Sequence, residues 1–355
     1  MHILIAVLSF CALIIIHELG HFIAAKLCGI QVNEFALGMG PVIFRKQGKE
    51  TSYVIRLLPI GGSVSMEGEN GGYEEDSDVQ SEPNPRAFNR KPVWQRMLVI
   101  LAGPIMNLIL GFFVVMISLC TSEAIASTTI SDFRDQAYSN SSLMVNDKVL
   151  EIEGMNVFTA TDITYKLQSS DRKNADGNLI FDILVERNGE KLMLEDVEFM
   201  TTTSEDGSTG IYFDFYVYRL QKNFVNIIEQ SFLESCSTGR LIYMTLFDML
   251  RGKYSLNDLS GPVGVVQVVS ESVSYGLSTF MSFVSLISIN VGIMNLLPIP
   301  ALDGCRFLFL IIEAIRRKPM KPEVEGMIHF AGFALLMLLM LVVTFNDVVK
   351  LFTGG

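Results

Sequence analysis

The chain has 355 residues, with 27 basic and 38 acidic side chains that give a formal net charge of −11. Half of its residues are hydrophobic and 18% are charged, whereas soluble globular proteins carry about 25% charged residues. This composition predicts a membrane protein and argues against a disordered chain, which would be poor in large aliphatic side chains. The acidic balance also argues against a nucleic-acid partner, because phosphate binding requires a basic surface.

Four apolar runs are long enough to cross a lipid bilayer, which takes about 20 mostly apolar residues in a helix. In chain order they are Ile3–Ala25, Leu98–Cys120, Leu277–Ile312 and Ile328–Phe345. The first run lacks the basic start of a signal peptide, so we expect a retained helix. The third run is interrupted by Pro298 and Pro300. We therefore predict a polytopic α-helical membrane protein with about four transmembrane helices.

The distribution of Lys and Arg predicts an orientation. Nine basic residues lie between the first two runs and four lie in residues 316–321, while residues 1–16 contain none. The positive-inside rule then places both loops in the cytoplasm and both termini outside. Residues 121–275 are left outside as well. They hold 23 acidic and 12 basic residues, so the whole net charge of −11 lies in this segment.

The first predicted cytoplasmic loop contains a candidate β-hairpin within Pro41–Glu69. Val42–Arg45 and Ser52–Leu57 are strand-like segments on either side of Gly48-Lys49, as in a hairpin. An exposed strand edge of this kind can hold an extended peptide by β-addition. The alternative is a plain cytoplasmic loop.

The first apolar run contains the sequence His17-Glu18-Leu19-Gly20-His21. Residues four apart share one face of a helix, so both imidazoles can bind one Zn²⁺ while Glu18 activates a water molecule. A charge at the centre of a membrane helix costs roughly 2.5–3.5 kcal/mol, so these three ionisable groups need a shared partner. The alternative is a His/Glu cluster satisfied by contacts with other helices.

A third zinc ligand is predicted at Asp303. Catalytic zinc usually takes three protein ligands and keeps a fourth position for water. Asp303 follows Pro298 and Pro300, which break the helix. Irregular backbone at membrane depth is tolerated only inside protein or beside a wet cavity, and a carboxylate ligand needs that environment. The alternative is an aspartate that only caps a loop.

Residues 127–200 predict a small mixed domain. Ser142–Asn156 has the pattern of a strand and turn, Thr161–Ser170 that of a helix, and Asn188-Gly189 joins strands at Ile180–Arg187 and Leu192–Phe199. This order resembles an α+β PDZ domain, with Asn146 where Gly is usual. Phe224–Leu250 follows as an amphipathic helix, which fits either the outer membrane surface or packing against a domain.

Several motifs in this order resemble the site-2 protease family, and most closely its RseP-type bacterial intramembrane zinc metalloproteases. They are HELGH at 17–21, LAGPIMNLILGF at 101–112, the PDZ-like insert, LSGPVG at 259–264 and NLLPIPALDG at 295–304. The resemblance implies one zinc ion bound by His17, His21 and Asp303, with Glu18 as general base. It also implies a bacterial plasma membrane and a membrane-associated hairpin. Cys305 departs from the second Gly that many members carry, and only one PDZ-like unit fits the insert.

The expected organisation has four parts. Residues 1–120 hold the first two transmembrane helices and the hairpin loop, 121–220 an extracytoplasmic PDZ-like domain, 221–275 an amphipathic connector, and 276–355 the C-terminal transmembrane helices. The resemblance implies cleavage of single-span membrane proteins, such as an anti-sigma factor or a remnant signal peptide. The PDZ-like domain would filter substrates or contact a peptide or envelope protein.

Three asparagines in the apolar runs are further candidates. Asn290 and Asn295 suit hydrogen bonds to the substrate backbone or the developing oxyanion, or equally contacts between helices. Asn107 is assigned to helix–helix contacts. The competing function is a catalytically silent membrane scaffold that presents the PDZ-like domain.

Overall fold

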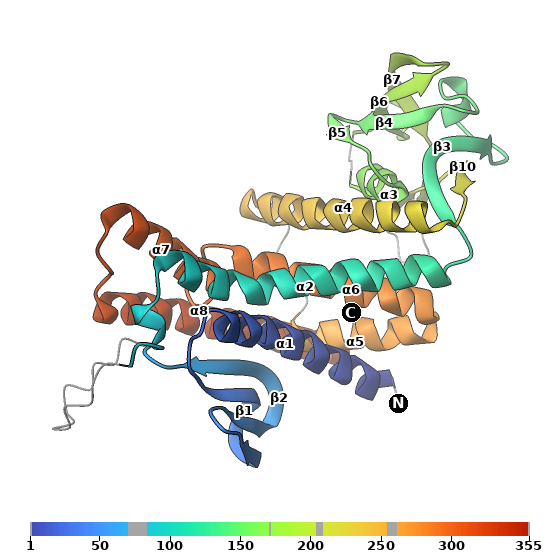
Figure 1. Ribbon diagram of the computed structural model, residues 1–355. Coiled ribbons are helices and arrows are strands. Elements are labelled where there is room, and N and C mark those ends of the chain that lie inside the picture. The colour runs from blue at the N-terminus through green and yellow to red at the C-terminus, as the bar shows by residue number, and fades with distance from the viewer. Residues whose placement is uncertain (1, 70–83, 170–171, 204–208, 254–260, 354–355) are drawn as a thin grey trace. The chain divides into compact units, whose positions relative to one another are not determined.

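The computed structural model describes residues 2–69, 84–169, 172–203, 209–253 and 261–353. The chain forms two compact units (Figure 1). The first consists of Met1–Val114 and Ile242–Gly355, and the second of Val115–Leu241. The second unit therefore begins within one long helix and ends within another. The predicted boundaries at 121 and 220 both lie inside it.

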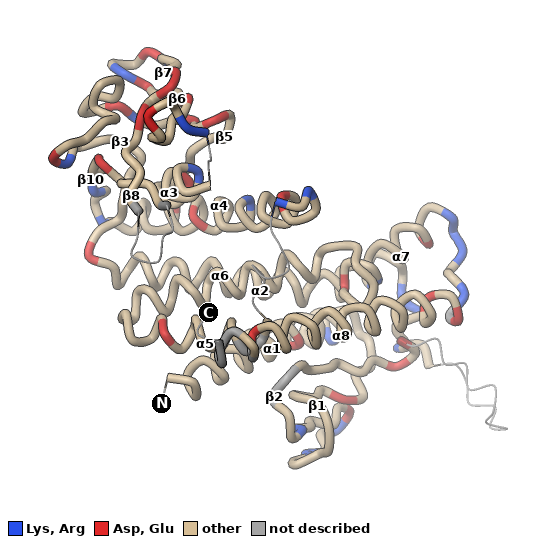
Figure 2. Tube along the Cα trace, turned by 180° about the vertical axis from the view of Figure 1, so that it is seen from behind, with Lys and Arg blue, Asp and Glu red and all other residues tan. Residues whose placement is uncertain are grey.

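Four helices in the described part of the chain are long and apolar enough to cross a membrane. They are α1 (His2–Leu27), α2 (Val93–Thr121), α6 (Leu277–Leu296) and α8 (Pro322–Thr353), the last through its segment Glu323–Asp347. Figure 2 shows that charged residues are sparse along these helices and frequent in the turn between α7 (Asp303–Arg316) and α8. The protein is thus a multi-pass membrane protein, as its composition predicted.

Prolines end and begin several of these helices. The third apolar run is divided: α6 ends at Leu296 and α7 begins only at Asp303. Pro298 and Pro300, which lack an N–H and restrict φ, lie in the loop between them. The short helix α5 (Pro262–Ser274) also begins with proline.

The start of α5 is bonded to α8. The carboxylate of Asp347, near the end of α8, accepts the N–H groups of Gly261 and Gly264 at 3.2 and 2.8 Å.

The predicted β-hairpin is present and is longer than expected. Strands β1 (Val32–Gln47) and β2 (Ser52–Met66) pair antiparallel, and both bend back: residues 34–37 lie opposite both 62–65 and 52–55, and residues 42–47 lie opposite 52–56. The base of the hairpin packs in a buried cluster with side chains of α1, α2 and α7. Its apolar side chains at 39–44 and 57–58 are exposed: Met39, Val42, Ile43, Phe44, Leu57 and Leu58. The short 3₁₀ helix η1 (Phe88–Arg90) precedes α2.

The second unit contains an antiparallel sheet in the order β10-β3-β4-β6-β7. Its strands are β3 (Ile125–Phe133), β4 (Lys148–Ile152), β6 (Leu179–Arg187), β7 (Glu190–Phe199) and β10 (Phe215–Leu220), and β5 (Met155–Asn156) pairs with β4. The remaining elements are 3₁₀ helix η2 (Ser139–Ser141), helix α3 (Ala160–Gln168) and the small sheet of β8 (Thr201–Thr203) and β9 (Thr209–Ile211). The helix and the hairpin predicted at 161–170 and 180–199 are therefore present.

Asn146 is exposed and has φ 74°, a left-handed conformation that Gly and Asn tolerate best.

Buried polar groups hold this unit together around its apolar core. Asp162 of α3 is fully buried and caps its own helix through the N–H groups of Phe158 and Thr159. It also accepts the hydroxyl of Ser237 and pairs with Arg240 at 2.6 Å, both from α4 (Phe224–Leu250). Asp162 thus joins α3 to the first part of α4.

Candidate metal centre

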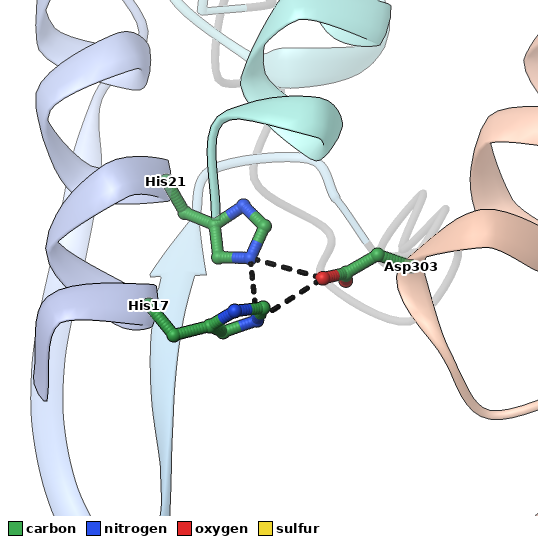
Figure 3. A group of neighbouring side chains, drawn as sticks. All are labelled: His17, His21 and Asp303. Atoms are coloured by element: carbon green, nitrogen blue, oxygen red, sulfur yellow. Dashed lines mark hydrogen bonds and ion pairs between the residues drawn. The ribbon is translucent and has the colours of Figure 1, made fainter. Parts of the chain in front are cut away.

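The three predicted zinc ligands meet in the first unit (Figure 3). His17 and His21 lie one turn apart on α1, and Asp303 is the first residue of α7. Asp303 Oδ2 lies 3.1 Å from His17 Nε2 and 3.3 Å from His21 Nε2, and the two Nε2 atoms are 3.3 Å apart. Ligand atoms about 2.0–2.1 Å from a tetrahedral zinc ion lie about 3.3 Å from one another. The triangle of donor atoms therefore fits one face of a zinc tetrahedron and leaves the fourth position free.

The second nitrogen of His21 is fixed by the backbone of α2. His21 Nδ1 lies 2.8 Å from the carbonyl oxygen of Val99. A carbonyl can only accept, so Nδ1 carries a proton, and in the neutral imidazole the lone pair is then on Nε2, the nitrogen nearest Asp303. Neutral imidazole in this tautomer is the form that binds zinc. The hydrogen bond thus orients His21 as a zinc ligand would require.

Asn107 of α2 makes the corresponding contact with His17. Its side-chain nitrogen lies 3.4 Å from His17 Nδ1, while its oxygen is buried without a hydrogen bond among the described residues. The two ends of an amide are assigned from their surroundings. With the amide turned over, the oxygen accepts the Nδ1 proton that the zinc-binding tautomer requires. The Asn107 side chain therefore contacts α1 beside the candidate ligands, which is the kind of helix–helix contact that the sequence suggested. Its backbone oxygen separately accepts the hydroxyl of Ser288 of α6 at 2.7 Å.

Two glycines allow α1 and α2 to approach closely beside the ligands. A Cβ on Gly103 would lie 2.2 Å from His21 Nε2, and a Cβ on Gly20 would lie 2.4 Å from the carbonyl oxygen of Ala102. Any side chain at either position would force the helices or His21 to move. The sequence indicates that Gly103-Pro104 allows a close helix approach or a kink, but the contact with His21 that requires glycine depends on a neighbouring helix.

Glu18, the predicted general base, is half-buried and packs against the hairpin. A Cβ on Gly62 of β2 would lie 2.6 Å from Glu18 Cγ. The hairpin strand therefore passes directly beside this carboxylate. Asn290 is exposed on α6 and Asn295 is half-buried. Within the described residues neither is hydrogen-bonded to His17, His21 or Asp303, and their roles stay predictions.

The loop that carries Asp303 returns tightly onto the end of α6. A Cβ on Gly304 would lie 2.2 Å from the carbonyl oxygen of Leu297. Within the loop, the N–H of Leu302 donates to the carbonyl of Ile299 at 3.1 Å and closes a turn. Cys305, which stands where many relatives were expected to carry Gly, is buried. The loop after the helix break therefore places the Asp303 carboxylate opposite His17 and His21 of α1.

Comparison with known proteins supports a peptidase. The sequence profile of peptidase family M50 matches residues 5–339. The zinc metalloprotease RasP of Shouchella clausii is 33% identical, over 97% of this chain and 98% of that protein. A putative zinc metalloprotease of Clostridium acetobutylicum is 36% identical over 98% of this chain and 97% of that protein. The regulator of sigma-W protease RasP of Bacillus subtilis is 32% identical over 98% of each chain.

Proposed function

The chain belongs to peptidase family M50 and is a zinc metalloprotease of the site-2 type, and from this premise we propose that it cleaves single-span membrane proteins within the bilayer. We assign zinc binding to His17, His21 and Asp303, and the role of general base to Glu18. The observation that carries the proposal is the meeting of three donor atoms, all within 4.8 Å of one another. Two of them stand on a helix long and apolar enough to span a membrane.

The proposed chemistry follows from these positions. A zinc ion held by His17, His21 and Asp303 would supply Lewis-acid chemistry for the scissile carbonyl and for a water molecule. Glu18 removes a proton from the attacking water and passes it to the leaving amine. The Val99 carbonyl and the Asn107 amide keep the imidazoles in their binding orientation.

The hairpin is the proposed binding surface for the substrate. Carbonyls in a transmembrane helix are already hydrogen-bonded, so a substrate must unwind before its peptide bonds can be attacked. A two-stranded sheet has unpaired edges that can bind an extended segment. Because β2 passes Glu18 at Gly62, a segment added to this edge would run beside the base. The close packing of Gly62 on Glu18 supports this arrangement.

We further propose that the protein acts in regulated intramembrane proteolysis from a bacterial plasma membrane, with both termini and the second unit outside the cytoplasm. The similarity to a Bacillus subtilis protease named as a regulator of sigma-W supports this class of role. An anti-sigma factor or a remnant signal peptide is the matching substrate. The second unit, interpreted as PDZ-like, would exclude substrates with bulky outer domains or contact a peptide.

The experiment co-expresses a tagged single-span substrate with the wild type, Glu18→Gln or Glu323→Gln. Glu18→Gln should abolish cleavage and retain zinc, because Glu18 is not a ligand. Glu323→Gln, an exposed substitution on α8, should cleave as the wild type does. Asp303→Ala should lose both zinc and cleavage. Equal cleavage by the wild type and Glu18→Gln would reject the protease assignment, and a wild type that binds zinc without cleaving would favour a silent scaffold.

A further inference from the structure

His329 of α8 holds the loop that carries Asp303. Its Nδ1 accepts the backbone N–H of Ala301 at 3.1 Å. Ala301 lies two residues before Asp303, in a loop where Pro298 and Pro300 have no N–H to donate. The hydrogen bond therefore connects one of the few backbone N–H groups of this loop to α8, a separate helix.

Ala301 adopts a conformation that its own side chain disfavours. Its φ is 76°, in the left-handed region, where Gly has no steric penalty. The turn Ile299–Leu302 has Pro300 at its second position and this positive φ at its third, a combination typical of a type II turn with Gly at the third position. Since Ala occupies the position instead, contacts from outside the turn must stabilise this conformation.

Helix α8 supplies such contacts through two residues on one face. A Cβ on Gly332 would lie 2.2 Å from Pro300 Cβ, so α8 presses directly on the turn. Three residues earlier, the ring of His329 meets the ring of Phe309 edge-on, with centroids 5.6 Å apart. Phe309 belongs to α7, the helix that begins at Asp303. His329 thus contacts both the turn before the ligand and the helix after it.

The hydrogen bond also defines the tautomer of His329. An N–H donor at Ala301 requires a lone pair on Nδ1, so the ring proton is on Nε2. That Nε2 is buried without a hydrogen-bond partner in the described part of the chain. The polar contact of this imidazole with the protein is therefore the one at Nδ1. An apolar side chain would fill the same space but leave the N–H of Ala301 without its acceptor.

We propose that His329 is a positioning residue for zinc binding, which acts through Ala301 to aim Asp303 at His17 and His21. The inference rests on the proposed function only in taking these three residues as the zinc ligands. Residues that orient metal ligands typically change metal affinity by about 10–100-fold when they are replaced. We expect zinc affinity to fall by an amount of this size when the hydrogen-bond acceptor at His329 Nδ1 is removed.

The test measures zinc affinity by competition with a chromophoric chelator, on the full-length protein in detergent. His329→Leu should weaken zinc binding at least about tenfold and change the visible spectrum of the Co²⁺-substituted protein, which reports ligand geometry. His329→Asn should keep its zinc affinity within about threefold of the wild type, because the amide oxygen of Asn lies where Nδ1 of His lay. This loss is a fraction of the usual effect of removing an orienting residue. Phe330→Leu, at an exposed neighbour on α8, is the matched control and should match the wild type in both measurements.

A double variant tests the route through Ala301. Glycine adopts a positive φ without strain, so His329→Leu should weaken zinc binding less in an Ala301→Gly background than in the wild type. If His329→Leu does not fold, the comparison of His329→Asn with His329→Gln decides, since Gln places its amide at the position of Nε2 and should lose affinity. Wild-type zinc affinity and an unchanged Co²⁺ spectrum in His329→Leu, or equal affinities of the Asn and Gln variants, would overturn the proposal.

This outcome is separable from that of the protease assignment. If Glu18→Gln cleaves as well as the wild type, the proposed catalytic function fails while the zinc titrations still report on His329. If Glu18→Gln is inactive and His329→Leu binds zinc normally, only the positioning role fails.

Discussion

At the scale of single residues, the proposed metal centre depends on groups other than its proposed ligands. His21 is held by a backbone carbonyl of α2, and His17 faces the amide of Asn107. Gly103 leaves the space that the His21 ring occupies. Each of these contacts comes from a helix distant in sequence from HELGH. The ligand motif is therefore necessary for the site, and its neighbours determine whether the ligand atoms meet.

The space at Gly103 gives a direct prediction. Gly103→Ala should weaken zinc binding by about 10–100-fold, because the new methyl group would lie 2.2 Å from His21 Nε2. Chelator competition on the purified protein measures the effect. Gly326→Ala is the matched control, since a Cβ there meets nothing within 4 Å. Equal zinc affinities of the two variants would contradict this account of Gly103.

A second prediction concerns Glu50 at the hairpin turn. Hydrogen bonding from Lys26 Nζ, at 2.7 Å, lowers the pKa of Glu50 from 4.5 to about 2. A lowered folded-state pKa stabilises the folded protein above pH 4.5, and this contribution is lost as the pH falls towards 2. The pair is partly exposed and is worth about 0.2–1 kcal/mol.

Hydrogen–deuterium exchange of the hairpin amides tests whether the stabilisation by Glu50 is lost as the pH falls. Glu50→Gln should exchange faster than the wild type at pH 6, and the difference should shrink as the pH approaches 2. The comparison is made between the two proteins at each pH, so the intrinsic pH dependence of exchange cancels. A difference that grows on acidification would contradict the assigned direction.

At the scale of elements, the hairpin and the helix break organise the site. The strands of the hairpin begin at Val32, well before the strand-like segment at 42–45, because the base of β1 is buried against α1 and α2. Local β-propensity predicts the segments at 42–45 and 52–57 and misses the buried start of β1. In the same way, Pro298 and Pro300 predict that a helix ends, but the packing of Gly304 on Leu297 determines where the next helix starts.

In the second unit, Asp162 is the polar group that joins two elements. Asp162→Ala should lower the free energy of unfolding of this unit by about 3–5 kcal/mol, because it leaves the Arg240 guanidinium without its buried partner and uncaps α3. Pulse proteolysis of the full-length protein in increasing urea measures the loss. Asp176→Ala, an exposed acidic residue of the same unit, should have almost no effect. An Asp162→Ala variant as resistant as this control would show that the buried pair contributes little.

At the scale of the whole molecule, charge is sorted along the chain. All of the net charge of −11 lies in residues 121–275, whereas basic residues gather at the hairpin and between α7 and α8 (Figure 2). Along the chain, helices with few charges lie between these segments. By the positive-inside rule, this distribution predicts which segments of the chain lie in the cytoplasm.

The proposed topology is testable by cysteine labelling. In a background without the five native cysteines, an impermeant maleimide on intact protoplasts should label Asp176→Cys. Lys49→Cys in the hairpin turn and Arg317→Cys after α7 should react only after permeabilisation. Labelling of Lys49→Cys on intact cells would reverse the predicted orientation.

The sequence by itself determined the features that depend on local order along the chain. Hydropathy runs predict the four long helices, the i, i+4 spacing places two imidazoles on one helix face, and the prolines predict a helix break before Asp303. Only the tertiary structure decided what depends on the distance between helices. It shows the Asn107 amide at His17, the requirement for Gly at 103, and the contact of His329 with Ala301. These contacts join residues far apart in sequence, and they form only when packing brings separate helices to within a few ångströms of one another.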